Sequence, residues 1–322
     1  MRPLSSSRGW HAPRMADGVP IHGDDVPEHA WDVGELRARR KRLGAATGAA
    51  RLGVAIIEIA PGARSTPPHA HVDEDEAFLV LAGAGVSYQS SGPDDARAYA
   101  VGVDDVLLHP RDGDAHALIA GEEGLRVLVV AEGSPTGLTW LPRTRQFWIG
   151  RRWSPPEGPP PFAADAQLGP LELPGLSPAR PPTIRNLGEL PLREGREGRL
   201  AYATRDVRDL GSERLVLAHD AMPPDTHNTD LHFHSAREEC WYVRGGSGVA
   251  RIGDEPFPLR PGSFWLRRAN GGVGHRVEVG SEGMDLITMG DLIPGDVCAY
   301  PERRVVRVAR GVDLPYVPEA SG

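Results

Sequence analysis

The chain has 322 residues, of which 40% are hydrophobic, and its formal net charge is −8 at pH 7. This length and composition predict about two globular domains, and no apolar run is long enough to cross a membrane. The negative charge argues against binding to a nucleic-acid backbone, and two cysteines are too few for a disulfide framework.

The chain begins MRPLSSSRGWHAPRMADG, which lacks the apolar stretch of a secretory signal, so we expect a cytoplasmic location. Residues 1–45 are polar and are expected to form an arm with a short helix around residues 33–43. Short runs rich in β-branched and apolar residues follow, with turn residues between them. They predict strands at 52–59, 77–81, 86–89, 106–108, 117–119 and 126–130. We therefore assign residues 46–150 to a first domain of antiparallel strands.

Residues 151–183 are rich in proline, which disfavours regular helices and central strands, so this segment is expected to be a linker. The apolar segment before it, residues 140–153, is expected to add a strand pair that could pack across domains. A second domain is assigned to residues 184–300, followed by a tail at 301–322. Its predicted strands repeat the plan of the first domain, at 214–218, 240–244, 248–252, 263–267, 276–279 and 285–289.

One pattern of histidine, glutamate and glycine occurs twice, about half a chain apart. The first copy consists of His69, His71, Glu76, Gly83 and Gly85, with His116 further on. The second consists of His232, His234, Glu239, Gly246 and Gly248, with His275 further on. By chance, a chain with this composition would contain roughly 0.06 such histidine pairs followed by an acidic residue five places on. The repeat therefore indicates an internal duplication and two similar domains.

The spacing within each copy predicts a metal site. Residues two apart in a strand face the same side, so the paired histidines project into one cavity. A four-residue loop then returns the glutamate beside them on the next strand, and the third histidine arrives from a distant strand. Three neutral imidazoles and one carboxylate suit a divalent ion with open positions for substrate. The predicted ligands are His69, His71, Glu76 and His116 in the first half and His232, His234, Glu239 and His275 in the second.

These residues resemble the first motif of the cupin superfamily, G(X)5-6HXH(X)3-4E(X)6G, and the tandem arrangement resembles a bicupin. Gly62 leads the first copy, whereas Asp225 replaces that glycine in the second. The second motif of the family is matched more loosely, since Asp104 stands where glycine is usual and Arg268 where proline is usual. The resemblance covers residues 50–132 and 213–291. It implies an all-β fold of two jelly-roll β-barrel domains, with a metal in the mouth of each barrel.

The family includes dioxygenases, decarboxylases, isomerases, hydrolases, regulators and storage proteins, so the fold alone leaves the reaction open. We expect a metal-dependent oxidoreductase, a dioxygenase that uses Fe(II) and O2 on a small anionic or enolisable substrate. The alternatives are a non-oxidative decarboxylase, isomerase or lyase with Mn(II), Zn(II) or Ni(II), and a non-catalytic binding or storage protein. Glu239 and Glu76 are the catalytic candidates, because a carboxylate detached from the metal can accept a substrate proton.

Four further residues are candidates for substrate binding. Strand alternation turns Trp241 inward with Glu239, although core filling is the alternative. Arg267 could pair with a substrate carboxylate, or could form an outward salt bridge. His227 could orient an imidazole from behind. His109 in the first half could line the cavity or lie at its rim. Because the second half offers more such groups, we expect it to carry the more demanding chemistry.

The family resemblance also implies a homodimer, and the apolar segment 140–153 offers a surface for it. Small-molecule substrates are the expected partners, with no nucleic acid and no membrane. Cys240 and Cys298 are expected to be ordinary buried thiols.

Overall fold

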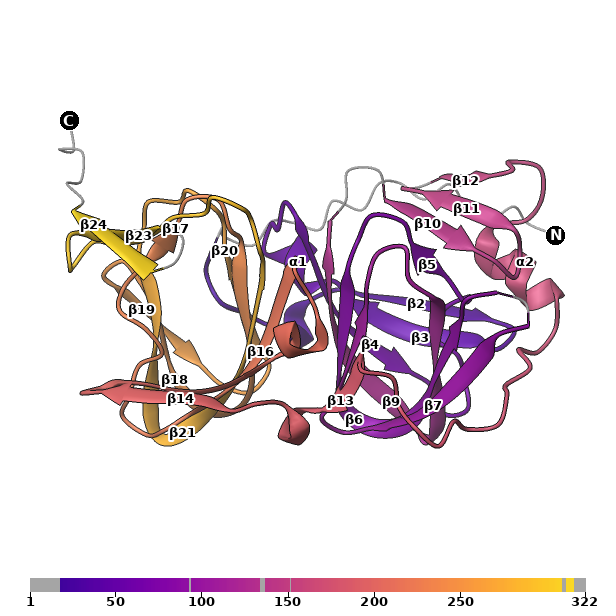
Figure 1. Cartoon of the computed structure of the whole chain (residues 1–322), viewed down its shortest axis with the longest axis horizontal. Helices are drawn as coiled ribbons and strands as arrows, with labels where there is room; N and C mark the ends of the chain where they lie inside the picture. The colour runs from indigo at the N-terminus through magenta and orange to yellow at the C-terminus, as the bar shows by residue number, and fades with distance from the viewer. Residues whose placement is uncertain (1–17, 93, 134–136, 151, 309–310, 316–322) are drawn as a thin grey trace.

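The computed structural model describes residues 18–92, 94–133, 137–150, 152–308 and 311–315. Figure 1 shows two strand-rich halves side by side. Among the described residues, each half is built from one eight-stranded sheet and one four-stranded sheet. This arrangement is the predicted all-β pair of jelly-roll barrels. Every helix in the described ranges is too short or too polar to cross a membrane.

The first half contains an antiparallel sheet in the order β13-β8-β6-β9-β4-β3-β2, with β7 paired to β6. Its strands are β2 (Glu28–Val33), β3 (Leu36–Lys41), β4 (Leu52–Ile59), β6 (Glu76–Ser90), β7 (Ala96–Gly102), β8 (Asp105–His109), β9 (Ala115–Glu132) and β13 (Ile184–Asn186). The smaller sheet contains β5 (Ala70–His71), β10 (Leu138–Leu141), β11 (Gln146–Ile149) and β12 (Arg152–Ser154). The helices of this region are α1 (Leu43–Ala46) and α2 (Pro161–Gln167).

The second half repeats the plan, in the order β1-β20-β18-β21-β16-β15-β14 with β19 paired to β18. Its strands are β1 (Ile21–His22), β14 (Arg193–Glu197), β15 (Leu200–Asp206), β16 (Leu215–Met222), β18 (Glu239–Ile252), β19 (Glu255–Leu259), β20 (Ser263–Arg267) and β21 (His275–Asp291). The smaller sheet contains β17 (Phe233–His234), β22 (Cys298–Tyr300), β23 (Val305–Val308) and β24 (Val312–Pro315). Short 3-10 helices are η1 (Gly23–Asp25), η2 (Leu187–Glu189) and η3 (Val207–Leu210).

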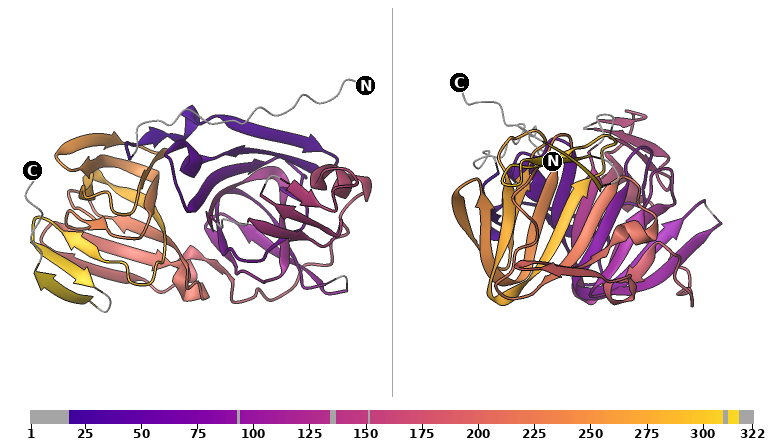
Figure 2. Two further views of the ribbon diagram at one scale, coloured as in Figure 1. Left: turned by 90° about the horizontal axis from the view of Figure 1, so that it is seen from above. Right: turned by 60° about the vertical axis from the view of Figure 1, so that its left-hand side comes forward.

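The halves exchange edge strands. Strand β1, from the start of the chain, pairs with β20 of the second half, and β13 pairs with β8 of the first half. The indigo N-terminal segment accordingly extends along both halves in the left view of Figure 2. Each exchange covers a strand edge that would otherwise expose unpaired main-chain groups.

Strand alternation divides the apolar residues between three cores. In β18, Trp241 and Val243 face the interior of the second barrel, whereas Cys240 and Tyr242 face the first half. The first barrel has a matching interior around Phe78. The third core joins the outer faces of the two large sheets, so burial of apolar area binds the halves together.

A buried carboxylate reinforces this interface next to a predicted metal ligand. Glu238 is 1% exposed and accepts hydrogen bonds from the main-chain N–H groups of residues 50–52, at 2.8 to 3.1 Å. Arg51 also donates to Asp291 across the interface at 2.5 Å. The strand that begins at Glu239 is therefore anchored to the first half.

The predicted strands are present, but several neighbouring pairs are single long strands. The runs predicted at 77–81 and 86–89 both lie in β6, and those at 240–244 and 248–252 both lie in β18. Register shifts around Gly83 and Gly246 bend these strands without ending them. Both glycines have positive φ, and a Cβ at either would clash with the facing main-chain carbonyl. The motif glycines thus permit a bend at close approach.

The helix predicted at residues 33–43 is wrong, because β3 occupies most of this segment and α1 begins only at Leu43. Leu36 and Ala38 are buried while Arg37 and Arg39 are exposed, which is the period of a strand. Strands β2 and β3 extend the first sheet through β4, so this part of the predicted arm belongs to the barrel. Residues 1–17 of that arm lie outside the described residues.

The segments predicted as linker and tail also contain regular structure. Helix α2 lies within 151–183 and begins at Pro161. Proline is tolerated there, because the N–H group of the first helical residue has no partner within the helix. Asp165 of this helix is fully buried between Arg64 and Arg143, at 2.5 and 3.2 Å. Strands β23 and β24 lie in the predicted tail and pair onto β22. Segment 140–153 forms strands as predicted, but they pair with β5 of the same half rather than across domains.

Because the central core is shared, we expect the halves to unfold in one transition. Phe264 is fully buried in that core, so Phe264→Ala should lower the free energy of unfolding by about 3–5 kcal/mol. The exposed Val273→Ala should change it by less than about 0.5 kcal/mol. Denaturant unfolding followed by fluorescence and circular dichroism checks this. Two separate transitions, of which Phe264→Ala shifts only one, would contradict a shared core.

Candidate metal centres

The four predicted ligands of the first half converge. The main chains of His69 and His116 exchange hydrogen bonds at 3.1 and 2.8 Å, which sets their side chains next to each other. His71 lies in β5, and Glu76 begins β6. The Glu76 Oε2 atom is 3.1 Å from His116 Nε2 and 3.5 Å from His71 Nε2. One ligand atom from each of the four residues lies within 4.8 Å of the other three.

Polar atoms behind the imidazoles fix their orientation. His69 Nδ1 is 3.0 Å from the Pro67 carbonyl, and His116 Nδ1 is 3.4 Å from the Asp114 carbonyl. A carbonyl only accepts, so this contact places the proton of His69 on Nδ1 and leaves its Nε2 lone pair for a metal. The Nε2 atom of His116 donates to Glu76 in the free site. His71 Nδ1 faces Glu74 at 3.3 Å, which favours the same tautomer as in His69.

The electrostatics of the first centre fit a cation. Burial, helped by the neighbouring imidazoles, lowers the pKa of His69 to about 3, so this ring stays neutral. Burial opposes ionisation of Glu76, but the hydrogen bond from His116 and the nearby His71 ring hold its pKa well below the usual value. His71 Nε2 is buried, lies 3.5 Å from Glu76 and makes no hydrogen bond. The neutral ring of His69, the ionised carboxylate and this unsatisfied nitrogen suit a divalent ion.

The second centre has the same frame. His232 and His275 exchange main-chain hydrogen bonds at 3.2 and 2.8 Å. Glu239 Oε2 lies 3.3 to 3.7 Å from the Nε2 atoms of His232, His234 and His275. Burial lowers the pKa of His275 to about 3. His234 Nδ1 lies 2.5 Å from Asp296 Oδ2, which fixes its ring.

Three features distinguish the second centre, and sequence reasoning missed them. Arg237 Nη2 lies 3.4 Å from Glu239 Oε1, in space left by the absent side chain of Gly290. Aligning the two copies of the repeat would have revealed Arg237, because Glu74 holds the equivalent place. Asp296 and Cys298, close to His234, lie far beyond the motif and gave no local signal.

His109 and Trp241 both contact ligand histidines. The His109 ring stacks on His116 with centroids 3.8 Å apart and is 6% exposed, so the alternative of a rim position is wrong. Burial holds the pKa of His109 well below its usual value, so the ring is neutral. Trp241 is 1% exposed, stacks on Trp265 and meets the His275 ring edge-on at 4.9 Å. This environment favours core filling for Trp241.

Arg267 and His227 are placed differently. Arg267 lies opposite Glu239 in the β18–β20 register, but its Nη2 donates to the Val273 carbonyl at 3.3 Å. His227 forms main-chain bridges to Leu200 and Glu278, and its Nδ1 faces the Thr229 carbonyl at 3.1 Å. Their assignment to substrate binding remains a prediction.

Arg40 is a further residue that sequence reasoning missed. It pairs in register with Ile57, which belongs to the interior core of the first barrel, so its side chain lies on the inner face. Burial, reinforced by the charge of Arg42 and opposed by Glu76, lowers the pKa of Arg40 to about 10. Its Nε is buried without a hydrogen bond. The equivalent residue of the second half is Thr204, which donates to Asp220.

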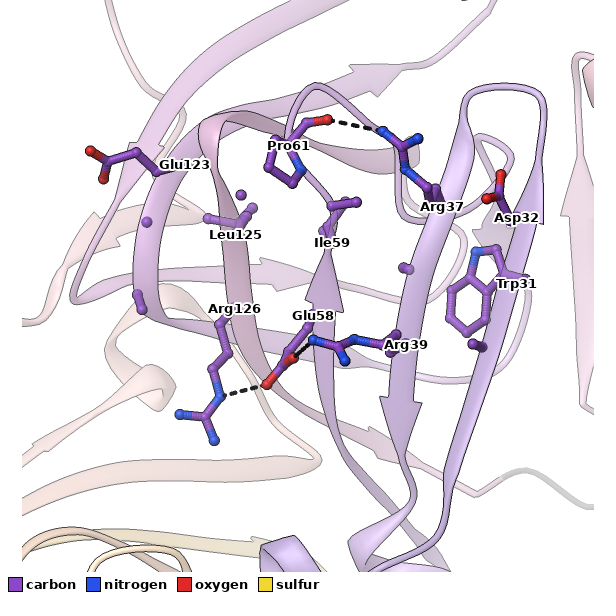
Figure 3. Close-up of a pocket in the computed structure, with 16 residues that line it drawn as sticks. Trp31, Asp32, Arg37, Arg39, Glu58, Ile59, Pro61, Glu123, Leu125 and Arg126 are labelled. Carbon is purple, nitrogen blue, oxygen red and sulfur yellow. Dashed lines mark hydrogen bonds and ion pairs between the residues drawn. The ribbon is translucent and has the colours of Figure 1, made fainter.

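Figure 3 shows a cavity of about 690 Å³ over β2, β3, β4 and β9. None of the predicted ligands lines it. Glu58 pairs there with Arg39 at 2.7 Å and Arg126 at 3.5 Å. The charges of Glu58, Arg39 and Arg126 thus partly compensate each other in this cavity.

No family model and no curated protein sequence matches the chain. Solved structures do match. Oxalate decarboxylase from Bacillus subtilis at pH 4.6 is 16% identical over 85% of this chain and 76% of its own, with a TM-score of 0.57. The structure concerned with the Mn(II) centres of this Bacillus subtilis enzyme is 18% identical over 88% and 80%, with a TM-score of 0.57. A third, on the substrate binding mode and a reaction specificity switch in oxalate decarboxylase, is 19% identical over 88% and 80%, with a TM-score of 0.59.

Identities this low show a shared fold. The similarity spans 85–88% of this chain.

We expect two metal ions per chain, because each half brings its predicted ligands together. His71→Ala and His234→Ala should each bind one ion, and His227→Ala should still bind two. Elemental analysis of purified protein measures this. If the wild-type chain holds a single ion and one mutant loses it entirely, the other half is not a metal centre.

Proposed function

We propose that the chain is a metal-dependent enzyme that removes carbon dioxide from a small carboxylic acid without using oxygen. The observation that carries this proposal is the converged ligand set of the first half, which lies in the same barrel as the buried side chain of Arg40. The similarity to oxalate decarboxylase favours this alternative over the dioxygenase predicted from sequence.

Mn(II) is the proposed ion of the first centre, in place of the Fe(II) expected from sequence. Its nitrogen and oxygen donors suit such an ion, and the similar Bacillus subtilis enzyme has Mn(II) centres. His69, His71, His116 and Glu76 would hold it. When bound, the ion supplies Lewis-acid polarisation of the substrate carboxylate.

Charge favours an anionic substrate in the first cavity. The charges of Arg40 and Arg42 also act on His29, whose pKa is lowered by burial and by both arginines. A carboxylate beside Arg40 and Arg42 would offset the repulsion between their two guanidinium groups. It could also accept two hydrogen bonds from Arg40. In the second half, Arg237 is already paired with Glu239. We therefore assign turnover to the first half, which reverses the expectation from sequence.

The reaction balances without an oxidant. Loss of carbon dioxide leaves an electron pair on carbon, and that carbon takes up one proton, so a hydrogen oxalate ion would give carbon dioxide and formate. Glu76 is ionised in the free site and is positioned beside two imidazoles. When detached from the metal, it is the group proposed to accept the acid proton of the substrate and return it to carbon. His109 holds the His116 ring by stacking.

Glu76→Gln keeps the shape of the side chain but removes the proton acceptor. It should lower kcat by at least about 100-fold, whereas Glu239→Gln should cost less than about 10-fold. The assay is carbon dioxide release from oxalate and other small carboxylates by Mn(II)-loaded protein, with metal content checked for each variant. Turnover should continue without oxygen. Activity that requires oxygen would support the dioxygenase, and a dead Glu239→Gln with an active Glu76→Gln would place turnover in the second half.

Arg40→Met should raise KM for a carboxylate substrate by about 10-fold or more, since a charge-assisted hydrogen bond is lost. Metal content should not change, because Arg40 is not a proposed ligand. Arg39→Met is the matched control, since Arg39 is the exposed neighbour on the opposite face of β3. Equal kinetic constants for Arg40→Met and wild type would refute substrate binding by Arg40.

A further inference from the structure

We propose that Cys298 is a ligand of the second metal centre, which makes this centre selective for a softer divalent cation, such as Zn(II) or Co(II), than the first. This inference rests on the proposal that the second centre binds metal. It changes the donor set expected from sequence, where Cys298 is an ordinary thiol.

Strand pairing brings Cys298 to the site. In the antiparallel pair β17–β22, His234 lies directly opposite Cys298. Directly opposite residues have their side chains on the same face of the pair. The equivalent pair in the first half joins His71 to Thr139, at 3.4 Å between Nδ1 and Oγ1. A sulfur atom thus replaces a hydroxyl at one position of otherwise similar sites.

The ligand atoms of the second half form two overlapping groups. His232, Glu239 and His275 form one group, and His232, His234 and Cys298 form the other, with all atoms of a group within 4.8 Å of one another. In the first half, by contrast, all four predicted ligands form one group. His232 is common to both groups, whereas Glu239 and Cys298 share no group, so the thiol would join an ion held by His232 and His234.

Burial, together with the charges of Glu239 and Asp296, raises the pKa of the Cys298 thiol to about 11, so the thiolate would form only as a metal binds. Arg237 lies 3.4 Å from Glu239 and compensates part of its charge. A thiolate at Cys298 would restore one negative charge to the ligand set, and its proton would pass to solvent as the metal binds. Sulfur ligands favour softer ions, whereas the first centre offers only nitrogen and oxygen.

The test is titration of the metal-free, full-length chain with Co(II). Two ions should bind per chain, and one of them should give the near-ultraviolet charge-transfer absorption of a cobalt thiolate. Cys298→Ser should abolish this absorption. Cys240→Ala is the matched control, because Cys240 faces the shared core, and it should retain the absorption. His71→Ala should also retain it while binding one ion less.

A second measurement does not depend on replacing Cys298. In His71→Ala loaded with one Zn(II), X-ray absorption at the zinc edge should show one sulfur neighbour per ion. A bound ion with only nitrogen and oxygen neighbours, or cobalt absorption that persists in Cys298→Ser, would overturn the role of Cys298 and leave the proposed function intact. Failure of this variant to bind any ion would overturn the second centre itself.

Discussion

Both candidate centres depend on one main-chain contact, the reciprocal hydrogen bonds that join the first and last histidines of each site. His69 pairs in this way with His116, and His232 with His275. Strand alternation then directs the second histidine to the same cavity, and the next strand begins with the glutamate. The carbonyls of Pro67 and Asp230 hold the Nδ1 atoms of the first histidines. The site is therefore part of the sheet, and its ligands are preorganised.

The sequence predicted what is encoded by local spacing. The HxH pair and the following glutamate lie within eight residues, so strand period alone determined their shared face. The helix predicted at residues 33–43 was wrong because the many charged residues of β3 are typical of a polar helix. Only the alternation of buried and exposed positions indicates a strand. Arg40, Asp296 and Cys298 could not be placed, since Arg40 and Cys298 reach their sites through sheet pairing distant from the motif, and Asp296 through the turn between β21 and β22. Arg237 could have been noticed, because the repeat aligns it with Glu74.

The duplication has produced two sites with different surroundings. The first barrel has an arginine on its inner face whose Nε makes no hydrogen bond to the described residues, whereas the arginine of the second site is paired with the ligand glutamate. A threonine near the first site corresponds to a cysteine near the second. The shared core holds the two barrels together, so these differences arise from a few side chains on the same frame. We propose that the first half turns over substrate and that the second holds a softer ion.

The most direct test of this account is anomalous diffraction from crystals of the chain, recorded at the manganese and zinc edges. We expect two anomalous-difference peaks per chain. One should lie among His69, His71, Glu76 and His116, and the other beside His232 within reach of Cys298. The first should have manganese character when both ions are offered, and the second zinc. A chain with a single peak, or with peaks away from these histidines, would contradict the claim that each copy of the repeat builds a metal centre.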